Sequence, residues 1–287
     1  MSNSLQYVTS LPRVFNELLG KEIFVPEPLT RIVSLSPATT ETLFMLGLGD
    51  SIVGVSAFCL RPPEAQNKRI LGTYNTIDLE ALSILAPEII FTTTGFQRIF
   101  AFDLSARLNV YPTPLPTSVA DIIGSVVEIG LVTGRYDEAR HLASKLTRVV
   151  GAYELVERLV RSYVELDLGA PTSFGAYSYI TDALFLAGGL NVFGHEPCSW
   201  LVPDPKKVIA EDPEVMIYEP KMLEPFDEEK LQALLIERGW TGVSAVRNKR
   251  AFLVPGRPLD FLAHHGPSFV TDALPWLRKV MAGISGS

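Results

Sequence analysis

Short apolar runs alternate with stretches of helical spacing along the first half of the chain. The run Ile32 to Ser36 is typical of a strand, and apolar residues three or four apart follow it from Thr39 to Leu46. Pro37 and Gly47 stand where a helix commonly starts and stops. By the same criteria we expect strands at 52–55, 88–91 and near 110, and helices at 79–85, 98–108 and 118–131. This alternation predicts a mostly parallel sheet with helices on its faces.

The second half repeats the alternation after a long segment of helical spacing. Between Asp137 and Leu166 there is no Pro and a single Gly, which predicts one helix of about 30 residues and roughly 45 Å. The prediction is an α/β fold of two Rossmann-like lobes, residues 1–136 and 169–287, joined by a single long rigid helix at 137–168. A stiff connection should let the lobes shift only slightly. In the second lobe we expect strands at 172–176, 215–218 and 251–254, and helices at 182–187, 205–211, 227–238 and 269–281.

The charge balance argues against polyanionic partners. Lys and Arg total 25 against 32 Asp and Glu, which gives a net charge of −7 and a pI of about 5.2. We therefore expect no nucleic acid partner. No stretch approaches the roughly 18 uninterrupted apolar residues of a membrane-spanning helix, so we expect no direct membrane insertion. Cys59 and Cys198 are far apart in sequence and form neither a close-spaced zinc motif nor a disulfide framework.

The motifs of common enzyme classes are missing from the sequence. Gly47-Leu-Gly49 has no third glycine at the spacing that dinucleotide binding requires. There is no G-x-x-x-x-G-K-[ST] phosphate loop and no G-x-S-x-G nucleophile motif. The chain has four histidines, so acid–base chemistry has few candidates. We therefore expect a binding protein and no enzyme.

Several short motifs, in a fixed order, resemble one protein family. Arg31-Ile-Val-Ser-Leu-Ser-Pro-Ala-Thr-Thr-Glu41 is the most specific, and weaker ones follow at 46–50, 53–56, 78–82, 86–90, 187–193 and 245–250. Over about residues 17–282 the chain resembles the metal-chelate substrate-binding proteins of ABC importers, including the cobalamin-binding proteins, which share the class III periplasmic binding protein fold. Those proteins carry vitamin B12, haem or iron-siderophore complexes. The resemblance implies a chelate held in a cleft between the lobes, with metal present only as part of that chelate and no cofactor of the protein's own.

A bulky, flat, apolar chelate requires aromatic walls and a few polar anchors. Similarity to the B12-binding members places Phe58, Tyr74 and Trp200 where that group presents aromatic rings to its ligand. For each ring the alternative is packing beneath a loop. All the aromatic candidates are predicted in loops after strands: Phe58, Tyr74, Phe96, Tyr177, Tyr179, Trp200 and Phe261.

Hydroxyl groups follow the first and fourth predicted strands. Ser34, Ser36 and Thr39 should lie at the carboxyl ends of the sheet, where ligands of open α/β sheets bind. The alternative is that Ser36 only caps its helix. After the 88–91 strand, where the cobalamin binders have another aromatic residue, this chain has Thr92-Thr93-Thr94-Gly95. Thr93 and Thr94 suit a more polar ligand or an oxyanion.

Two adjacent histidines are the clearest metal-like feature. His264 and His265 precede the last predicted helix, and imidazole is a common metal ligand. We expect His264 to contact a metal already inside a chelate; a bare-metal or oxyanion receptor that uses His264, Thr93 and Thr94 remains open. His195 and Cys198 could add a second ligand, or all of these could be ordinary polar loop residues. Arg61 and Arg257 could pair with carboxylates or phosphate of the ligand, or be solvated surface residues.

Importer members of the family dock to a permease through one exposed glutamate on each lobe. Glu80 matches the first position, but the second falls near Lys206, with Asp204 as a shorter substitute. A reversed charge lowers docking affinity. The first 25 residues show no export-signal pattern. The resemblance therefore implies an extracytoplasmic importer component, while a native start at Met1 would favour the alternative, a cytosolic chelate-binding chaperone or sensor that does not dock.

Overall fold

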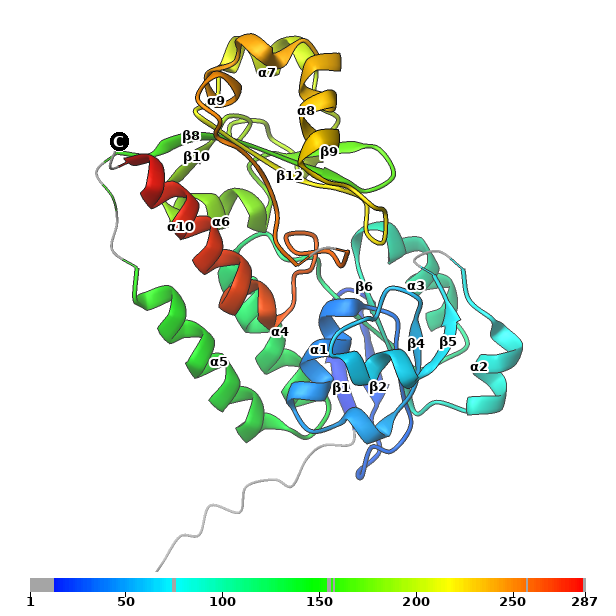
Figure 1. The fold of residues 1–287 in the computed structure, drawn as a ribbon. Helices are drawn as coiled ribbons and strands as arrows, with labels where there is room; N and C mark the ends of the chain where they lie inside the picture. The colour runs from blue at the N-terminus through cyan, green and yellow to red at the C-terminus, as the bar shows by residue number, and fades with distance from the viewer. Residues whose placement is uncertain (1–12, 74–75, 154–155, 157, 257, 286–287) are drawn as a thin grey trace, which may run out of the picture. The chain divides into compact units, whose positions relative to one another are not determined.

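The computed structural model describes residues 13–73, 76–153, 156, 158–256 and 258–285. Within these residues the chain divides into two compact units (Figure 1). Unit 1 is the chain up to Leu115 together with Gly124–Ser144, and unit 2 is Pro116–Ile123 with the chain from Lys145 onward. In the described part of the chain, no helix has both the length and the apolar character to cross a membrane.

Unit 1 contains an all-parallel sheet in the order β5-β4-β3-β6-β7. Val33 and Leu35 pack against α2 and α3 on one face, while Ser34 contacts Thr40 of α1 on the other. This arrangement follows from right-handed crossovers, because the chain moves from β3 toward β4 and β5 in one direction and then returns from β5 to β6 and β7 in the other. The bounds are β3 Ile32–Ser34, α1 Pro37–Met45, β4 Ile52–Ser56, β5 Arg69–Gly72, α2 Leu79–Leu85, β6 Ile89–Thr93, α3 Arg98–Ser105 and β7 Val110–Thr113.

Smaller elements and two helices complete unit 1. A hairpin precedes the sheet, and short 3-10 turns connect its strands. The helices α4 and α5 each belong partly to both units. The bounds are β1 Arg13–Asn16, β2 Lys21–Phe24, the turns η1 Gly49–Ser51, η2 Pro63–Asn67 and η3 Gly95–Gln97, α4 Val119–Val132 and α5 Tyr136–Gly151.

Unit 2 contains a mixed sheet in the order β11-β9-β8-β12-β13, with β10 also paired to β8. Strands β8, β10, β12 and β13 are parallel, and β9 and β11 are antiparallel additions at one edge. Tyr163 and Met216 pack with side chains of α7 and α8. Ser162 contacts Met281 of α10. Figure 1 shows α7 and α8 on one face of this sheet and α10 on the other. The strand bounds are β8 Val160–Asp167, β9 Pro171–Phe174, β10 Gly189–Asn191, β11 Trp200–Leu201, β12 Val215–Glu219 and β13 Ala251–Leu253.

The helices of unit 2 begin at strong local signals. Asp204 and Asp227 cap α7 and α8 with their side chains, as acidic N-cap residues commonly do. A short π-helical turn, η5, precedes α10. The bounds are α6 Tyr179–Ala187, α7 Pro205–Glu211, α8 Glu228–Glu237, η4 Trp240–Gly242, α9 Ser244–Arg247, η5 Phe269–Ala273 and α10 Leu274–Ser285.

The single helix predicted from Asp137 to Leu166 is wrong beyond Gly151. α5 ends at Gly151, and β8 begins at Val160. Most of β8 is buried, and a buried strand has a nearly continuous apolar run that spacing alone does not distinguish from a helix. The rigid connection of about 30 residues inferred from that spacing is therefore also incorrect.

Candidate functional site

The carboxyl ends of β3 and β6 form the switch point of the sheet in unit 1. β3 continues into α1 on one face of the sheet, and β6 continues into α3 on the other. In open α/β sheets, ligands bind outside the strands at this point, because the two connections leave a crevice between them. The residues after β3 and β6 are therefore the first place in this unit to look for a ligand site.

A buried glutamine bridges the two strands where they separate at the switch point. The last direct bond of the ladder runs from Leu35 N to Phe91 O, 2.9 Å. Beyond it, Gln97 Nε2 donates to Leu35 O at 3.1 Å, and Gln97 Oε1 accepts from Thr93 N at 3.0 Å. The amide of Gln97 thus extends the ladder across a gap. Sequence reasoning did not identify Gln97, because one of its two partners, Leu35, lies 62 residues away in the chain.

The hydroxyls after β3 form a hydrogen-bonded cluster around the start of α1. Thr40 Oγ1 lies 2.8 Å from Ser34 Oγ and 2.9 Å from Ser36 O. Ser36 Oγ accepts from Thr39 N at 3.4 Å, so Ser36 is the N-cap of α1. Cys59 is buried in the same cluster, with its sulfur 3.0 Å from Thr40 Oγ1. The capping role that the sequence left open for Ser36 is confirmed.

The three threonines at the end of β6 differ in their partners. Thr94 Oγ1 accepts from Leu115 N at 2.7 Å. The hydroxyls of Thr92 and Thr93 are buried and have no hydrogen-bond partner among the described residues. Buried hydroxyls are normally paired, so this pair of exceptions requires an explanation.

The remaining predicted residues of unit 1 lie in several kinds of structure. Phe58 and Arg61 are half-buried in the loop after β4. Phe96 was expected in a loop but lies in the 3-10 turn η3, and its side chain is outside the described part of the chain. Tyr74 also lies outside the described residues.

In unit 2 a buried carboxylate shapes the loop that follows β13. Glu219, at the end of β12, accepts from the backbone N–H groups of Phe261 at 2.7 Å, Leu262 at 2.6 Å and Ala263 at 3.2 Å. Burial raises the pKa of Glu219 to about 7, although these N–H groups favour its ionised form. The carboxylate therefore fixes the backbone directly before His264. Sequence reasoning missed Glu219 because its partners follow 42 to 44 residues later.

Tyr179 holds the same loop through a hydrogen bond and ring contacts. Its hydroxyl donates to Leu262 O at 2.8 Å, and its ring packs on His265 and Phe269. Tyr179 was expected in a loop after a strand; it is the first residue of α6 and is buried, because the Ser178 cap starts the helix there. Its hydroxyl and ring are therefore occupied within the unit.

The other predicted residues of this loop are partly enclosed. His264 is buried, and Phe261 packs edge-on against Trp276. Burial lowers the pKa of His265 to about 4, with His264 adding to the effect, so His265 is neutral at pH 7. Arg257 lies outside the described residues. Within the described ranges, no three His, Cys, Asp or Glu side chains gather in a group that could hold a metal ion.

A second loop of unit 2 is bound to the end of β9. Ala176 N donates to Glu196 O at 2.8 Å, and Tyr177 N donates to Cys198 O at 3.0 Å. These bonds hold the exposed ring of Tyr177 close to the backbone before Trp200. Trp200 was expected in a loop but belongs to β11, where its backbone pairs with Phe174, and its ring is exposed.

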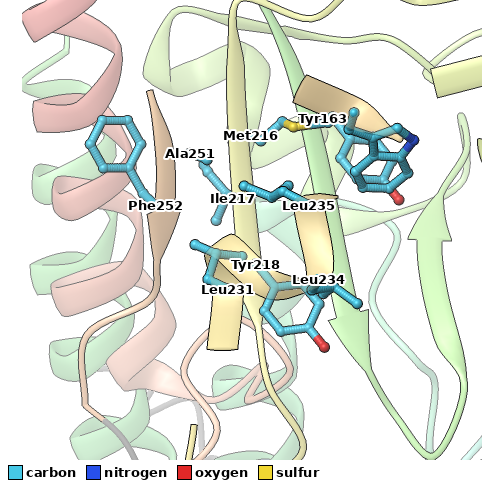
Figure 2. A pocket seen from close by; sticks show the side chains of 10 residues that line it. Tyr163, Met216, Ile217, Tyr218, Leu231, Leu234, Leu235, Ala251 and Phe252 are labelled. Carbon is cyan, nitrogen blue, oxygen red and sulfur yellow. The ribbon is translucent and has the colours of Figure 1, made fainter. Parts of the chain in front are cut away.

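A small cavity lies under α8 in unit 2. Figure 2 shows Met216 of β12 with Leu231 and Leu235 of α8 around it. Its volume is about 10 Å³, which is the room that one water molecule needs. It is therefore far too small for a chelate.

Next to this cavity is a buried ion pair. Arg238 donates to both oxygens of Glu165, at 2.7 and 2.6 Å, and the Tyr163 hydroxyl donates to the same carboxylate. Arg238 also lies over the ring of Trp240, 4.9 Å from its centroid. All these groups are paired with one another, which indicates a structural role.

The predicted docking residues lie at helix starts. Glu80 is exposed in the first turn of α2. Asp204 is exposed as well, but its carboxylate accepts from Lys206 N at 2.9 Å and caps α7.

Comparison with known proteins gives consistent matches. The model of the periplasmic binding protein family matches residues 32–258. The vitamin B12-binding protein of Photorhabdus laumondii subsp. laumondii is 24% identical over 229 residues, which cover 72% of this chain and 78% of that protein. The vitamin B12-binding protein of Yersinia pseudotuberculosis serotype O:3 is 26% identical over 217 residues, with 72% and 76% covered.

Solved structures share the fold. The periplasmic heme-binding protein RhuT from Roseiflexus sp. RS-1 matches with a TM-score of 0.72 and 22% identity, covering 88% of this chain and 99% of that one. The vitamin B12 binding protein BtuF of Vibrio cholerae matches with a TM-score of 0.70 and 20% identity, covering 91% and 100%. The predicted α/β class with parallel sheets is confirmed.

Proposed function

The chain belongs to the periplasmic binding protein family, and from this premise we propose that it binds a metal chelate without altering it, for import by an ABC transporter. The chelate class we propose is cobalamin, haem or a ferric siderophore. The observation that carries the proposal is the family match over most of the chain, together with curated relatives named as vitamin B12-binding proteins. An extracytoplasmic location belongs to the same proposal.

We propose that two groups of residues contact the chelate: the loops at the carboxyl ends of the parallel strands, and the rings of Tyr177 and Trp200 beside the antiparallel edge strands β9 and β11. The exposed rings of Tyr177 and Trp200 suit stacking on a flat apolar ligand, since a ring exposed without ligand still has surface to bury. Buried Tyr179 then acts indirectly, because it supports the loop that carries Phe261 and His264. The other proposed contacts are Phe58, Arg61, Tyr74, Thr93, Thr94, Phe96 and Arg257.

Isothermal titration with cobalamin, haemin and a ferric siderophore tests the ligand class. We expect saturable binding of at least one, and recovery of that ligand with unchanged mass after denaturation. Trp200→Ala should lower its affinity about tenfold, the effect of losing one stacked ring. Phe102→Ala is the matched control, because Phe102 on α3 is 43% exposed and Trp200 is 44% exposed. Binding of none of the three would reject the proposal, and a chemically changed ligand would replace it with an enzyme.

A second function is favoured by one observation at the docking positions. Asp204 already serves as the cap of α7, and exposed Lys206 presents a cation beside it. A chelate-binding protein that does not dock to a permease, such as a cytosolic chaperone or sensor, fits this chemistry. Fractionation of the native cells decides between the two: recovery outside the cytoplasm supports the importer, and recovery in the cytosol supports the second function. In the importer case, Glu80→Lys should abolish chelate uptake while leaving the chelate Kd unchanged.

A further inference from the structure

Two neighbouring hydroxyls in the interior of unit 1 have no hydrogen-bond partner. Thr92 Oγ1 and Thr93 Oγ1 are both buried and unpaired among the described residues. An unpaired buried hydroxyl costs about 1 to 3 kcal/mol. Because they are consecutive residues of β6, their side chains point to opposite faces of the sheet. The two hydroxyls therefore have different surroundings.

The strand register places Thr93 beside the start of α1. Ser34 pairs with Phe91 across β3 and β6, and the Gln97 bridge continues this register, so Ser36 lies opposite Thr93. Ser34 and Ser36 both bond to residues of α1, which puts that face of the sheet under α1. Thr93 therefore faces the N-terminus of α1, and Thr92 faces α2 and α3.

The first turn of α1 has a backbone N–H group without an acceptor in the described part of the chain. Pro37 has no N–H, and the N–H of Ala38 has no acceptor among the described residues. The one capping bond there, from Thr39 N to Ser36 Oγ, is long at 3.4 Å. A helix N-terminus also carries a partial positive charge that favours anions. Both hydroxyl oxygens are covered, but Thr93 as a whole residue keeps 6% of its surface exposed and Ala38 9%, whereas Thr92 keeps 0%.

We propose that Thr93 Oγ1 and the Ala38 N–H form a subsite for an anionic oxygen of the ligand, from a carboxylate or a phosphate. Two neutral donors and a helix dipole fit one such oxygen. The subsite deepens the proposed function and rests on it for the identity of the ligand. A haem propionate, the phosphate of cobalamin and free inorganic phosphate all present this chemistry.

Inorganic phosphate tests the subsite without any chelate. In amide-resolved NMR of the full chain, we expect phosphate to shift the Ala38 resonance saturably. Thr93→Val removes only the hydroxyl and should weaken this binding at least fivefold. Thr92→Val is the matched control, because it removes the other unpaired hydroxyl, and it should leave phosphate binding unchanged. Neither variant should lower the Tm without ligand, since neither loses a hydrogen bond.

A chelate series then identifies the source of the oxygen. If haemin binds, Thr93→Val should weaken haemin about tenfold but leave its dimethyl ester, which has no carboxylates, unaffected. If cobalamin binds, Thr93→Val and not Thr92→Val should weaken it. An effect on phosphate with none on the bound chelate assigns the subsite to free phosphate. No phosphate shift at Ala38, or equal effects of the two valine variants, overturns the subsite. Failure of all chelates in the wild type rejects the proposed function alone, because the phosphate measurement still decides the subsite.

Discussion

The carboxyl ends of the two sheets are built from different chemistry. In unit 1 the strand ends are held by neutral groups, the amide of Gln97 and the hydroxyls of Ser34 and Thr40. In unit 2 an ionisable side chain, Glu219, holds the corresponding loop, and a second carboxylate, Glu165, is buried farther back on β8. Neutral groups keep their hydrogen bonds at every pH, whereas buried carboxylates depend on partners and on protonation. We therefore expect the carboxyl-end loop of unit 2 to respond to pH more strongly than the strand ends of unit 1.

One feature of the sequence makes this difference measurable. All three tryptophans, Trp200, Trp240 and Trp276, belong to unit 2. Tryptophan fluorescence therefore reports unfolding of unit 2, and hydrogen exchange of β6 reports unit 1.

The largest effect is expected from breaking the buried ion pair of unit 2. Arg238→Met leaves Glu165 buried without its cation, so the free energy of unfolding should fall by about 3 to 5 kcal/mol. Denaturant titration followed by tryptophan fluorescence measures the change. Arg158→Met is the control, because its pair with Glu214 is exposed and should contribute only about 0 to 1 kcal/mol. Equal losses in the two variants would contradict the assignment.

A smaller loss is expected from removing the amide bridge of unit 1. Gln97→Leu leaves Leu35 O and Thr93 N–H unpaired in the interior, which should cost about 2 kcal/mol. Faster hydrogen exchange at Ile89–Thr93 would reveal it, with tryptophan fluorescence unchanged under native conditions. Gln66→Leu, at an exposed glutamine of the same unit, should change stability by less than about 0.5 kcal/mol. A tryptophan response to Gln97→Leu would show that the units do not respond separately.

The pH dependence of unit 2 should come from two opposing groups. The pKa of Glu219 in the folded protein is about 7, above its ordinary 4.5. Between these values the folded protein keeps a proton that the unfolded protein releases. The free energy of unfolding therefore falls as the pH rises from 4.5 to 7. The pKa of His265 in the folded protein is about 4, below its ordinary 6.5. Between these values the unfolded protein binds a proton that the folded protein does not. The free energy of unfolding therefore rises as the pH rises from 4 to 6.5. Between pH 4.5 and 6.5 the two contributions largely cancel.

Glu219→Gln should expose the contribution of His265. Unit 2 of this variant should then gain stability between pH 4.5 and 6.5 with a slope of up to one proton, about 1.4 kcal/mol per pH unit. Denaturant midpoints across that range provide the measurement. Glu196→Gln, at a half-buried carboxylate that contacts Lys207, should keep the wild-type profile. An unchanged slope in Glu219→Gln would refute the opposition of the two groups.

The smallest effects should be alike in the two units. Asp78 caps α2 in unit 1 and Asp227 caps α8 in unit 2, each by accepting a backbone N–H at 2.9 Å. Replacing either with Ala should cost about 1 kcal/mol, because capping depends only on the local helix end. A difference of more than about 1 kcal/mol between the two variants would mean that unit context affects the caps.

Features that depend on neighbouring residues could be predicted from the sequence, and those that depend on distant partners could not. The helices α2 and α7 have the predicted bounds, because Asp78 and Pro205 are local start signals. β8 was assigned to a helix, since its pairing with β12 and β10 is what makes it a strand. At the candidate site, the threonines at the end of β6 could be found from their position. Gln97 and Glu219 could not, because only the folded chain brings their backbone partners to them.

Hydrogen exchange of the protein with and without its bound chelate tests the central claim most directly. If the chelate contacts the carboxyl ends of both sheets, the amides of residues 35–36, 38–39 and 92–97 in unit 1 and 259–266 and 268 in unit 2 should all exchange more slowly in the complex. Protection confined to one unit, or to the opposite ends of the strands, would contradict the claim.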